Sequence, residues 1–294
     1  MINIQKQIKE ATKNLDITNK AMLVSLSVSV YHGSKIDRKL TQEITKAKNA
    51  NRKSVKAVKE LIDVTTYINP IVAIRNIARL DNYKLTLPWL DDGTRILPFK
   101  HFQKYQDMMA EHQANFIKQV KFLIENKDKI LESAPVFLGD LYDSTDYKGW
   151  ENLEDKFKFD WVFLPFPSDQ DFRVSIPVQN VEYTAKKIED TLVKANKEAW
   201  NRLYFVINNV VTKLTDYNDG KINRFHDTLI DNIRDVLDIL PGLNITDDND
   251  LNNIIKHAKD KFSTVNPQAL REDESLRNDT IKEANLFLKK MKLS

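Results

Sequence analysis

The sequence predicts a mainly α-helical α+β protein with a small antiparallel sheet, long helices and a C-terminal helical bundle. Aromatic residues alternate with other residues over 156–164, which is typical of a strand. Helical spacings of three and four dominate elsewhere, most regularly over 181–214. A chain of 294 residues can bury a core without disulfides or metals. We expect a mixed helix and strand region (1–176) and a helical bundle (177–294), or one continuous domain.

The N-terminal part contributes one strand between two helical segments. A short polar helix is expected over 2–14. Residues 21–31 alternate Leu or Val with Ser, which predicts a strand with its branched side chains toward the core. From Asp37 to about Asp63 the residues favour a helix, and the apolar residues would form a narrow stripe along one side of it. The largely cationic faces of that predicted helix make it a candidate binding surface.

The middle of the chain predicts a helix, a hairpin and a longer helix. Residues 70–80 have helical spacing with a proline in the first turn. In 86–98, Asp92-Gly93 separates two short apolar runs and predicts a hairpin turn, because glycine adopts positive φ at little cost. A long helix with one apolar side is expected over 99–133. A loop with aromatic anchors is expected over 138–153.

The segment 156–176 predicts a β-hairpin whose first strand carries aromatic rings on one face. Rings at this spacing could stack on the bases of single-stranded RNA, or they could pack under the helices. The glycines that accompany aromatic residues in RNA recognition motifs are replaced here by Lys158 and Asp160, which favours packing. The aromatic residues concerned are Phe157, Phe159, Trp161 and Phe163.

The C-terminal region predicts a helical bundle. Residues 177–214 form the longest helix, with spacing typical of coiled-coil packing. Asp219-Gly220 ends it, and 222–240 returns as an antiparallel partner up to Pro241-Gly242. The apolar stripe of 181–214 could also pair with a second copy of the chain, so a homo-oligomer is possible.

Two further helices complete the predicted bundle. Thr246 or Asp247 is expected to cap a helix that extends through Lys261. A last helix is expected from about Glu272 to Met291. No internal repeat or long low-complexity linker interrupts the sequence.

The composition excludes several classes of function. Cysteine is absent, which excludes disulfides, thiolate zinc sites and iron–sulfur clusters and favours a reducing compartment. The six glycines are isolated, so the sequence lacks the glycine clusters of dinucleotide folds and phosphate-binding loops. No apolar run approaches the roughly 20 residues of a membrane-spanning helix. We expect a cytoplasmic protein with no cofactor and no membrane partner.

The charges are distributed unevenly although the net charge is only +3. Positions 35 to 59 contain nine basic residues and only two acidic ones, Asp37 and Glu43, whereas 139–171 is acidic. The nine residues are Lys35, Arg38, Lys39, Lys46, Lys48, Arg52, Lys53, Lys56 and Lys59. They could follow a nucleic-acid backbone, since neutralised phosphates release counterions. Alternatively they form a solvated helix face, which could dock on the acidic 139–171 region.

Metal and catalytic sites have weaker signals. The five histidines are scattered without a paired ligand spacing. Asp140, Asp143 and Asp146 could gather a divalent ion as in a nuclease, or they could belong to ordinary turns. No Gly-x-Ser-x-Gly elbow supports serine catalysis. The sequence therefore predicts neither catalytic residues nor metal ligands.

Three segments, TLPWLDDGTRILP, LGDLYDSTDY and FLPFPSDQDFRV, resemble a group of uncharacterised helical proteins encoded by bacteriophages. The resemblance covers the chain from Leu80 to Val174. It implies a phage accessory protein in the host cytoplasm rather than a metabolic enzyme. We therefore expect a non-enzymatic accessory protein that binds RNA or DNA through the 35–59 segment. The alternatives are a module that inhibits or scaffolds a host protein and, less favoured, a metal-dependent nuclease.

Overall fold

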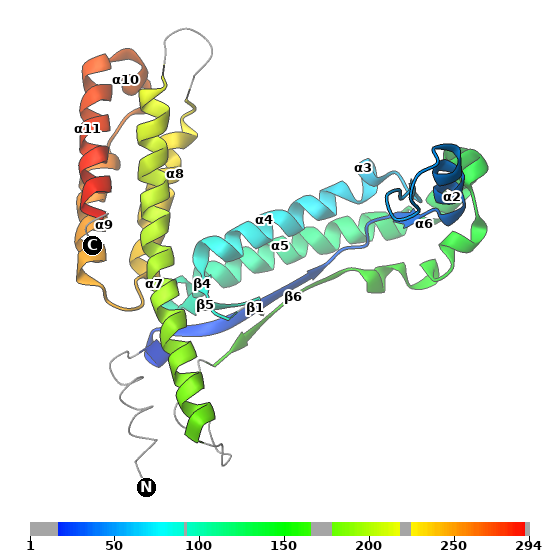
Figure 1. Cartoon of the computed structure of the whole chain (residues 1–294), viewed down its shortest axis with the longest axis horizontal. Coiled ribbons are helices and arrows are strands. Elements are labelled where there is room, and N and C mark those ends of the chain that lie inside the picture. The colour runs from blue at the N-terminus through cyan, green and yellow to red at the C-terminus, as the bar shows by residue number, and fades with distance from the viewer. Residues whose placement is uncertain (1–16, 91–92, 166–177, 218–224, 292–294) are drawn as a thin grey trace. The chain divides into compact units, whose positions relative to one another are not determined.

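The structure is a computed structural model that describes residues 17–90, 93–165, 178–217 and 225–291, with the side chains of 178–185 left out (Figure 1). Three predicted features therefore lie outside the described residues. They are the helix over 2–14, the return strand after residue 165 and the turn at Asp219-Gly220.

The chain divides into two compact units, each assembled from separated segments. Unit 1 comprises 1–25, 83–104 and 162–294, and unit 2 comprises 26–82 and 105–161. These units cut across the division at residue 176 that the sequence suggests.

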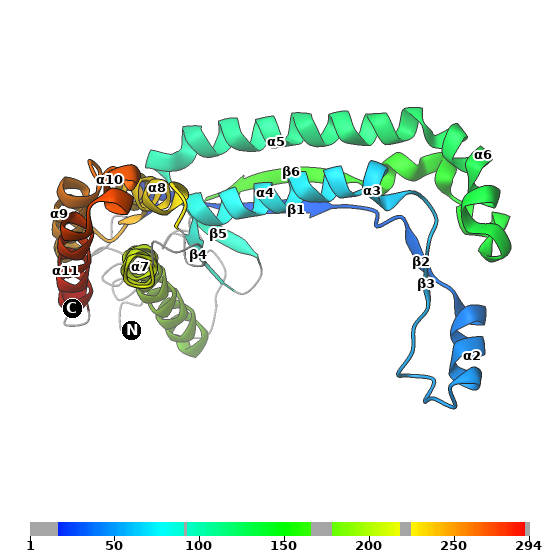
Figure 2. The same cartoon turned by 90° about the horizontal axis from the view of Figure 1, so that it is seen from above.

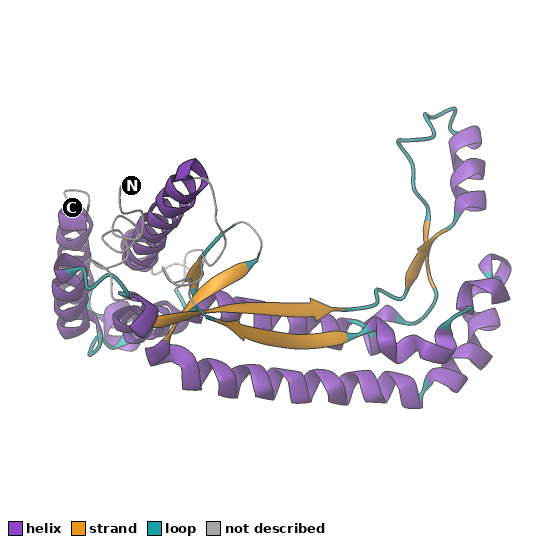
Figure 3. Cartoon of the chain, turned by 90° about the horizontal axis from the view of Figure 1, so that it is seen from below, coloured by secondary structure: helices purple, strands orange, loops and turns teal. Residues whose placement is uncertain are grey.

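A four-stranded sheet with the order β4-β5-β1-β6 confirms the predicted small sheet (Figure 3). Its strands are β1 (Ala21–Ser29), β4 (Leu87–Pro88), β5 (Thr94–Pro98) and β6 (Lys158–Leu164). The β1–β5 and β4–β5 pairs are antiparallel, with Met22 opposite Leu97 and Leu87 opposite Ile96. Gly93 has φ +84°, as the predicted hairpin turn requires.

The strand faces follow the alternation in the sequence, except that Ala21 and Leu23 on the serine face of β1 are also buried. On β1, Val24 and Val28 are buried while Ser27 and Ser29 are exposed. On β6, Phe159 is buried and its ring centroid lies 5.5 Å from that of Phe116. Trp161 is half-buried, and Phe163 packs against Phe102 with a centroid distance of 5.0 Å. The rings of β6 are therefore packed, as the core interpretation predicts.

Unit 1 contains the predicted helical bundle (Figure 1). The helices are α7 (Val178–Thr215), α8 (Thr228–Leu243), α9 (Asn249–Phe262), α10 (Pro267–Glu272) and α11 (Glu274–Met291), and a 3₁₀ turn, η1 (Ile17–Asn19), precedes β1. Helix α7 packs against α8 and α11. Its buried stripe includes Leu203 and Val210, as predicted, but passes through Ile207 rather than Val206.

Two predicted helix ends in unit 1 are wrong. The N-cap of α9 is Asp248, whose side chain accepts hydrogen bonds from the amides of Asp250 and Leu251. Asp247 cannot take that role because it lies in the left-handed region with φ +54°. Helix α8 does not end at Pro241-Gly242 but continues to Leu243, with Pro241 inside its last turn.

Gly242 leaves room for a buried histidine. The Nδ1 atom of His101 lies 3.1 Å from the carbonyl oxygen of Leu85, and the ring also bonds to the backbone of Ile239. Burial lowers the pKa of His101, so the neutral ring is favoured. A Cβ atom added at Gly242 would lie 2.1 Å from Nε2 of His101, far inside van der Waals contact.

Replacing Gly242 with alanine should destabilise unit 1 by about 2 kcal/mol, because the added methyl group overpacks the histidine contact. Hydrogen exchange of the α8 amides measures the loss. The same substitution in a His101→Ala background should cost much less, since the overlapping ring is gone. An equal cost in both backgrounds would exclude the overlap as its cause.

Unit 2 is built on α3 (Val64–Tyr67), α6 (Lys127–Leu138) and parts of α4 (Asn69–Leu85) and α5 (Phe99–Glu125). The predicted helix over 70–80 is confirmed within α4. The predicted helix over 99–133 is broken at Asn126, which has φ −98° and ψ 3°. Its side-chain amide donates to the carbonyl of Phe122, a local bond that competes with the helical ladder.

The acidic segment after α6 forms three 3₁₀ helices, η2 (Gly139–Leu141), η3 (Ser144–Tyr147) and η4 (Trp150–Lys156). Tyr147 and Trp150 are buried, as expected for aromatic anchors, whereas Tyr142 is exposed. The centroids of Tyr147 and Trp150 lie 4.9 Å apart in an edge contact. These rings fix the acidic loop in unit 2.

The helix predicted from Asp37 to about Asp63 is wrong beyond residue 47. Helix α2 covers Arg38–Ala47. Strand β2 (Ser34–Ile36), which precedes α2 in the chain, pairs with strand β3 (Val58–Glu60), which follows it. Asn49 has φ 47°, the left-handed conformation that ends helices. Residues 34–60 therefore form a two-stranded ribbon that carries α2 and an irregular return segment, here called the arm (Figure 2).

Candidate nucleic-acid interface

The ribbon at the base of the arm sorts its side chains onto two faces. Lys35 pairs with Lys59 and Ile36 pairs with Val58 in the antiparallel register. Directly opposite residues share a face, so both lysines lie on one side and both apolar residues lie on the other. Ile36 and Val58 are exposed. The lysine face is the side that is attached to the rest of unit 2.

Helix α2 is held against the return segment of the arm. The carboxylate of Asp37 caps α2 by accepting the amide of Leu40 at 2.9 Å. The amide of Asp37 donates to the carbonyl of Ala57 at 2.9 Å, and the hydroxyl of Thr41 accepts the amide of Ala57 at 3.0 Å. Thr41 is buried and Ile44 is half-buried, so this side of α2 faces the return segment.

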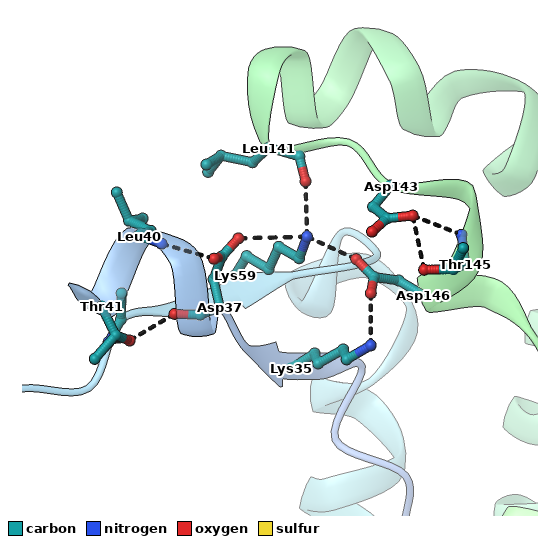
Figure 4. A network of polar contacts seen from close by, with 10 residues as sticks. Lys35, Asp37, Leu40, Thr41, Lys59, Leu141, Asp143, Thr145 and Asp146 are labelled. Carbon is teal, nitrogen blue, oxygen red and sulfur yellow. Dashed lines mark hydrogen bonds and ion pairs between the residues drawn. The ribbon is translucent and has the colours of Figure 1, made fainter. Parts of the chain in front are cut away.

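A buried ion-pair network, here called the anchor, fastens the ribbon to the acidic loop (Figure 4). The Nζ atom of Lys59 lies 2.6 Å from Oδ2 of Asp146 and 3.4 Å from Oδ2 of Asp37, and it donates to the carbonyl of Leu141 at 2.8 Å. Lys35 donates to Oδ1 of Asp146 at 2.6 Å. The side chains of Lys59 and Asp146 are only 7% and 4% exposed.

The anchor shifts the pKa of both buried groups toward their charged forms. Burial alone would raise the pKa of Asp146, but hydrogen bonds from Lys35 and Lys59 outweigh it and lower that pKa. Burial would lower the pKa of Lys59, but the Asp146 and Asp37 carboxylates outweigh it and raise that pKa.

These shifts fix the pH range over which the anchor stabilises the fold. The contribution of Asp146 is present above its ordinary pKa of about 3.9 and is lost as pH falls through the lower folded value. The contribution of Lys59 is present below its ordinary pKa of about 10.4 and is lost as pH rises through the higher folded value. The anchor is therefore ionised throughout the neutral range.

Further bonds hold the acidic loop that carries Asp146. Asp143 accepts hydrogen bonds from the amide and hydroxyl of Thr145 at 2.9 and 2.7 Å, and the hydroxyl bond is the main reason its pKa is lowered. The hydroxyl of Tyr147 donates to the carbonyl of Leu61 at 2.9 Å, and burial raises the pKa of Tyr147 to about 12.

The three predicted metal-site candidates have different partners and different roles in the structure. Asp146 is paired with lysines, Asp143 caps its own turn and Asp140 is exposed. Among the residues that the structure describes, no three His, Asp or Glu side chains gather as metal ligands.

The structure separates the nine predicted basic residues into two groups. Lys59 is buried in the anchor, which removes it from any accessible surface, and Lys35, 52% exposed, is bound to Asp146. For these two lysines, the alternative of docking on the acidic region holds. The other seven are exposed: Arg38, Lys39, Lys46, Lys48, Arg52, Lys53 and Lys56. None of the seven forms an ion pair with a carboxylate in the described part of the chain.

The seven exposed cations, here called the basic face, lie on two segments of the arm. Arg38, Lys39 and Lys46 lie on α2, where Arg38 and Lys46 share one face with Gln42 at spacings of four residues. Lys48, Arg52, Lys53 and Lys56 lie on the return segment, whose turn is shaped by Asn51 accepting the amide of Lys53 at 2.9 Å. Sequence reasoning missed Gln42, although its i, i+4 spacing from Arg38 was the available signal.

The five histidines belong to no group of three or more potential metal ligands among the described residues. His112 lies 2.8 Å from Oδ2 of Asp81, His101 is buried in unit 1, and the others are exposed.

Within the described ranges, no helix has the length and apolarity needed to cross a bilayer. Comparison with models of protein families, with curated proteins and with solved structures finds no match to this chain.

Proposed function

We propose that this protein is a non-enzymatic accessory protein, of the kind found in phages, that binds nucleic acid through the basic face of its arm. The observation that carries the proposal is the set of seven exposed cations without carboxylate partners among the described residues. Such cations neutralise phosphates and release counterions, which supplies most sequence-independent affinity. Glu43 is the one acid between residues 38 and 59, so little opposes the attraction.

The anchor supports this proposal because it fixes the arm in advance. Lys59 and Asp146 hold the ribbon, and the bonds from Asp37 and Thr41 to Ala57 hold α2 on the return segment. A surface that is ordered before binding loses less conformational entropy when it binds. The proposed role of Lys59 is therefore to position the arm, while the basic face makes the contacts.

A second candidate function is binding to a host protein. Exposed apolar side chains cluster where α6 ends, with Val136 90% exposed and Phe137 52% exposed, followed by Leu141 and Tyr142. Large apolar side chains grouped at a surface are typical of protein interaction sites. Substituting Val136 and Phe137 with serine would distinguish the two functions. The variant should lose binding to a host protein if this candidate is right, whereas nucleic-acid binding through the basic face should be unchanged.

The charge reversal Arg52→Glu, Lys53→Glu, Lys56→Glu tests the proposed function. We expect the variant to lose at least about 100-fold in affinity for labelled nucleic acid at low salt, since three attractive contacts become repulsive. A filter-binding salt series measures the change. For the wild type, affinity should fall steeply with salt, with a slope near −6 on logarithmic axes if all seven cations contact B-form DNA.

A matched control keeps the net charge change the same. Lys118→Glu, Lys129→Glu, Lys148→Glu alters three exposed lysines on α5, α6 and the acidic segment of unit 2. This control should bind nucleic acid much more tightly than the arm variant. If the arm variant retained labelled RNA and DNA like the wild type, the proposed function would be wrong.

A further inference from the structure

We infer that the ligand of the arm is double-stranded B-form DNA, with α2 lying in the major groove and the return segment on the phosphate backbone. The inference rests on the proposed function and names the nucleic acid that the basic face takes. It is carried by the juxtaposition of a polar helix stripe with a separate cationic segment that contains no aromatic residue.

The arm lacks the groups that bind single strands. Single-strand binders combine a cationic groove with aromatic side chains on which bases stack. The sequence contains no Phe, Tyr or Trp from His32 to Thr66. The nearest ring, Tyr31, is half-buried, with edge contacts to Trp150 at 6.2 Å and Phe157 at 6.5 Å. The basic face therefore offers charge and hydrogen bonds but no aromatic ring for base stacking.

Helix α2 has the dimensions and side chains of a groove-binding helix. Its ten residues span about 15 Å, and a B-form major groove about 12 Å wide admits an α-helix. Arg38, Gln42 and Lys46 form one exposed stripe. Arginine and lysine pair with guanine edges and glutamine pairs with adenine. The deep, narrow major groove of A-form RNA excludes such a helix.

The return segment completes the duplex contact. From Ile44 to Lys59 the sequence has no acid, and its exposed cations lie next to the C-terminal end of α2. In groove-binding proteins, contacts to phosphates fix the register of the helix, while contacts to base edges supply specificity. The arm combines both kinds of group within residues 38–56.

Fluorescence anisotropy with the full chain tests this inference. The probes are a 20-bp DNA duplex, the RNA duplex of the same sequence and one DNA strand alone, at a single salt concentration. We expect the DNA duplex to bind at least about tenfold more tightly than either other probe. Methyl green, a major-groove ligand, should displace the protein, whereas distamycin, a minor-groove ligand, should not.

Gln42→Ala tests a contact to a base edge independently of charge, because the substitution removes no charge. We expect it to weaken duplex binding by about tenfold, the effect of one good base contact, and to leave the salt slope unchanged because no charge is lost. Gln106→Ala, at an exposed position on α5, is the matched control and should bind like the wild type.

The outcomes distinguish this inference from the proposed function. Tighter binding to the single strand or to the RNA duplex, displacement by distamycin alone, or wild-type affinity in Gln42→Ala would overturn duplex recognition while the proposed function stands. If none of the three probes binds, the proposed function fails together with the inference.

Discussion

Replacing Asp146 with leucine should destabilise unit 2 by about 3 kcal/mol, because it leaves the Lys59 ammonium buried with fewer charged partners. The remaining contacts of Lys59 would be Asp37 at 3.4 Å and the carbonyl of Leu141 at 2.8 Å. Lys35 would lose its carboxylate as well, but its side chain is 52% exposed and water can solvate it. The loss should therefore come mainly from Lys59.

Lys59→Met should cost less than Asp146→Leu, because Lys35 still pairs with Asp146 at 2.6 Å. The double variant Lys59→Met, Asp146→Leu should recover most of the stability, since an apolar pair of similar volume can replace a buried ion pair with little loss. The two substitutions are thus expected to be strongly non-additive.

Native-state hydrogen exchange of the ribbon measures this cycle, because the amide of Leu61 bonds to the carbonyl of Gly33 at 2.8 Å beside the anchor. Lys148→Met, at an exposed lysine of the same unit, is the control and should leave protection unchanged. Additive losses in the double variant would show that Lys59 and Asp146 do not stabilise each other.

We also expect Asp146→Leu to weaken nucleic-acid binding, since an arm that opens must be ordered again on binding.

Elements with a clear periodicity could be predicted from the sequence. The Ser alternation of β1 and the hairpin turn at Gly93 each depend on neighbouring residues. The structure has a strand over Ala21–Ser29, and it pairs β4 with β5 on either side of the turn. The apolar spacing of α7 predicts its buried stripe in the same way, with the exception of Ile207. Local patterns suffice here because backbone geometry decides which side chains share a face.

The arm could not be predicted in this way because its structure depends on distant partners. Residues 48–60 have helical propensity, yet Asn49 ends α2 in the left-handed region and Val58–Glu60 pairs with Ser34–Ile36. The sheet register joins residues more than 20 positions apart, whereas propensity reports only on neighbours. Tertiary pairing outweighs a weak helical preference.

For the same reason, the sequence predicts which cations of the candidate site are exposed but not which of them is buried. A run of charges identifies exposed cations such as Arg52 and Lys53 correctly, since such residues remain solvated unless a partner meets them. It cannot show that Lys59 meets Asp146, which lies far along the chain and comes close only through the turn of η3. Burial separates the positioning lysine from the exposed ones.

Gly33→Ala should destabilise unit 2 by about 3 kcal/mol through two effects that act at the base of the arm. Gly33 has φ +65°, a conformation that costs an L-residue about 1–2 kcal/mol. Its added Cβ would also lie 2.4 Å from Cγ2 of Ile62 and 3.1 Å from Cγ1 of Ile68. Both isoleucines are almost completely buried, so overpacking adds a further cost of about 1–3 kcal/mol.

Gly149→Ala separates the two effects. Gly149 has φ +85°, but a Cβ atom there would meet nothing within 4 Å, so only the backbone cost of about 1–2 kcal/mol is expected. The difference between the two variants, measured by hydrogen exchange at the Leu61 amide, gives the cost of the overlap with Ile62. Equal losses would mean that the backbone conformation alone requires glycine at position 33. A larger loss in Gly33→Ala would mean that close packing against Ile62 and Ile68 also fixes the start of the arm.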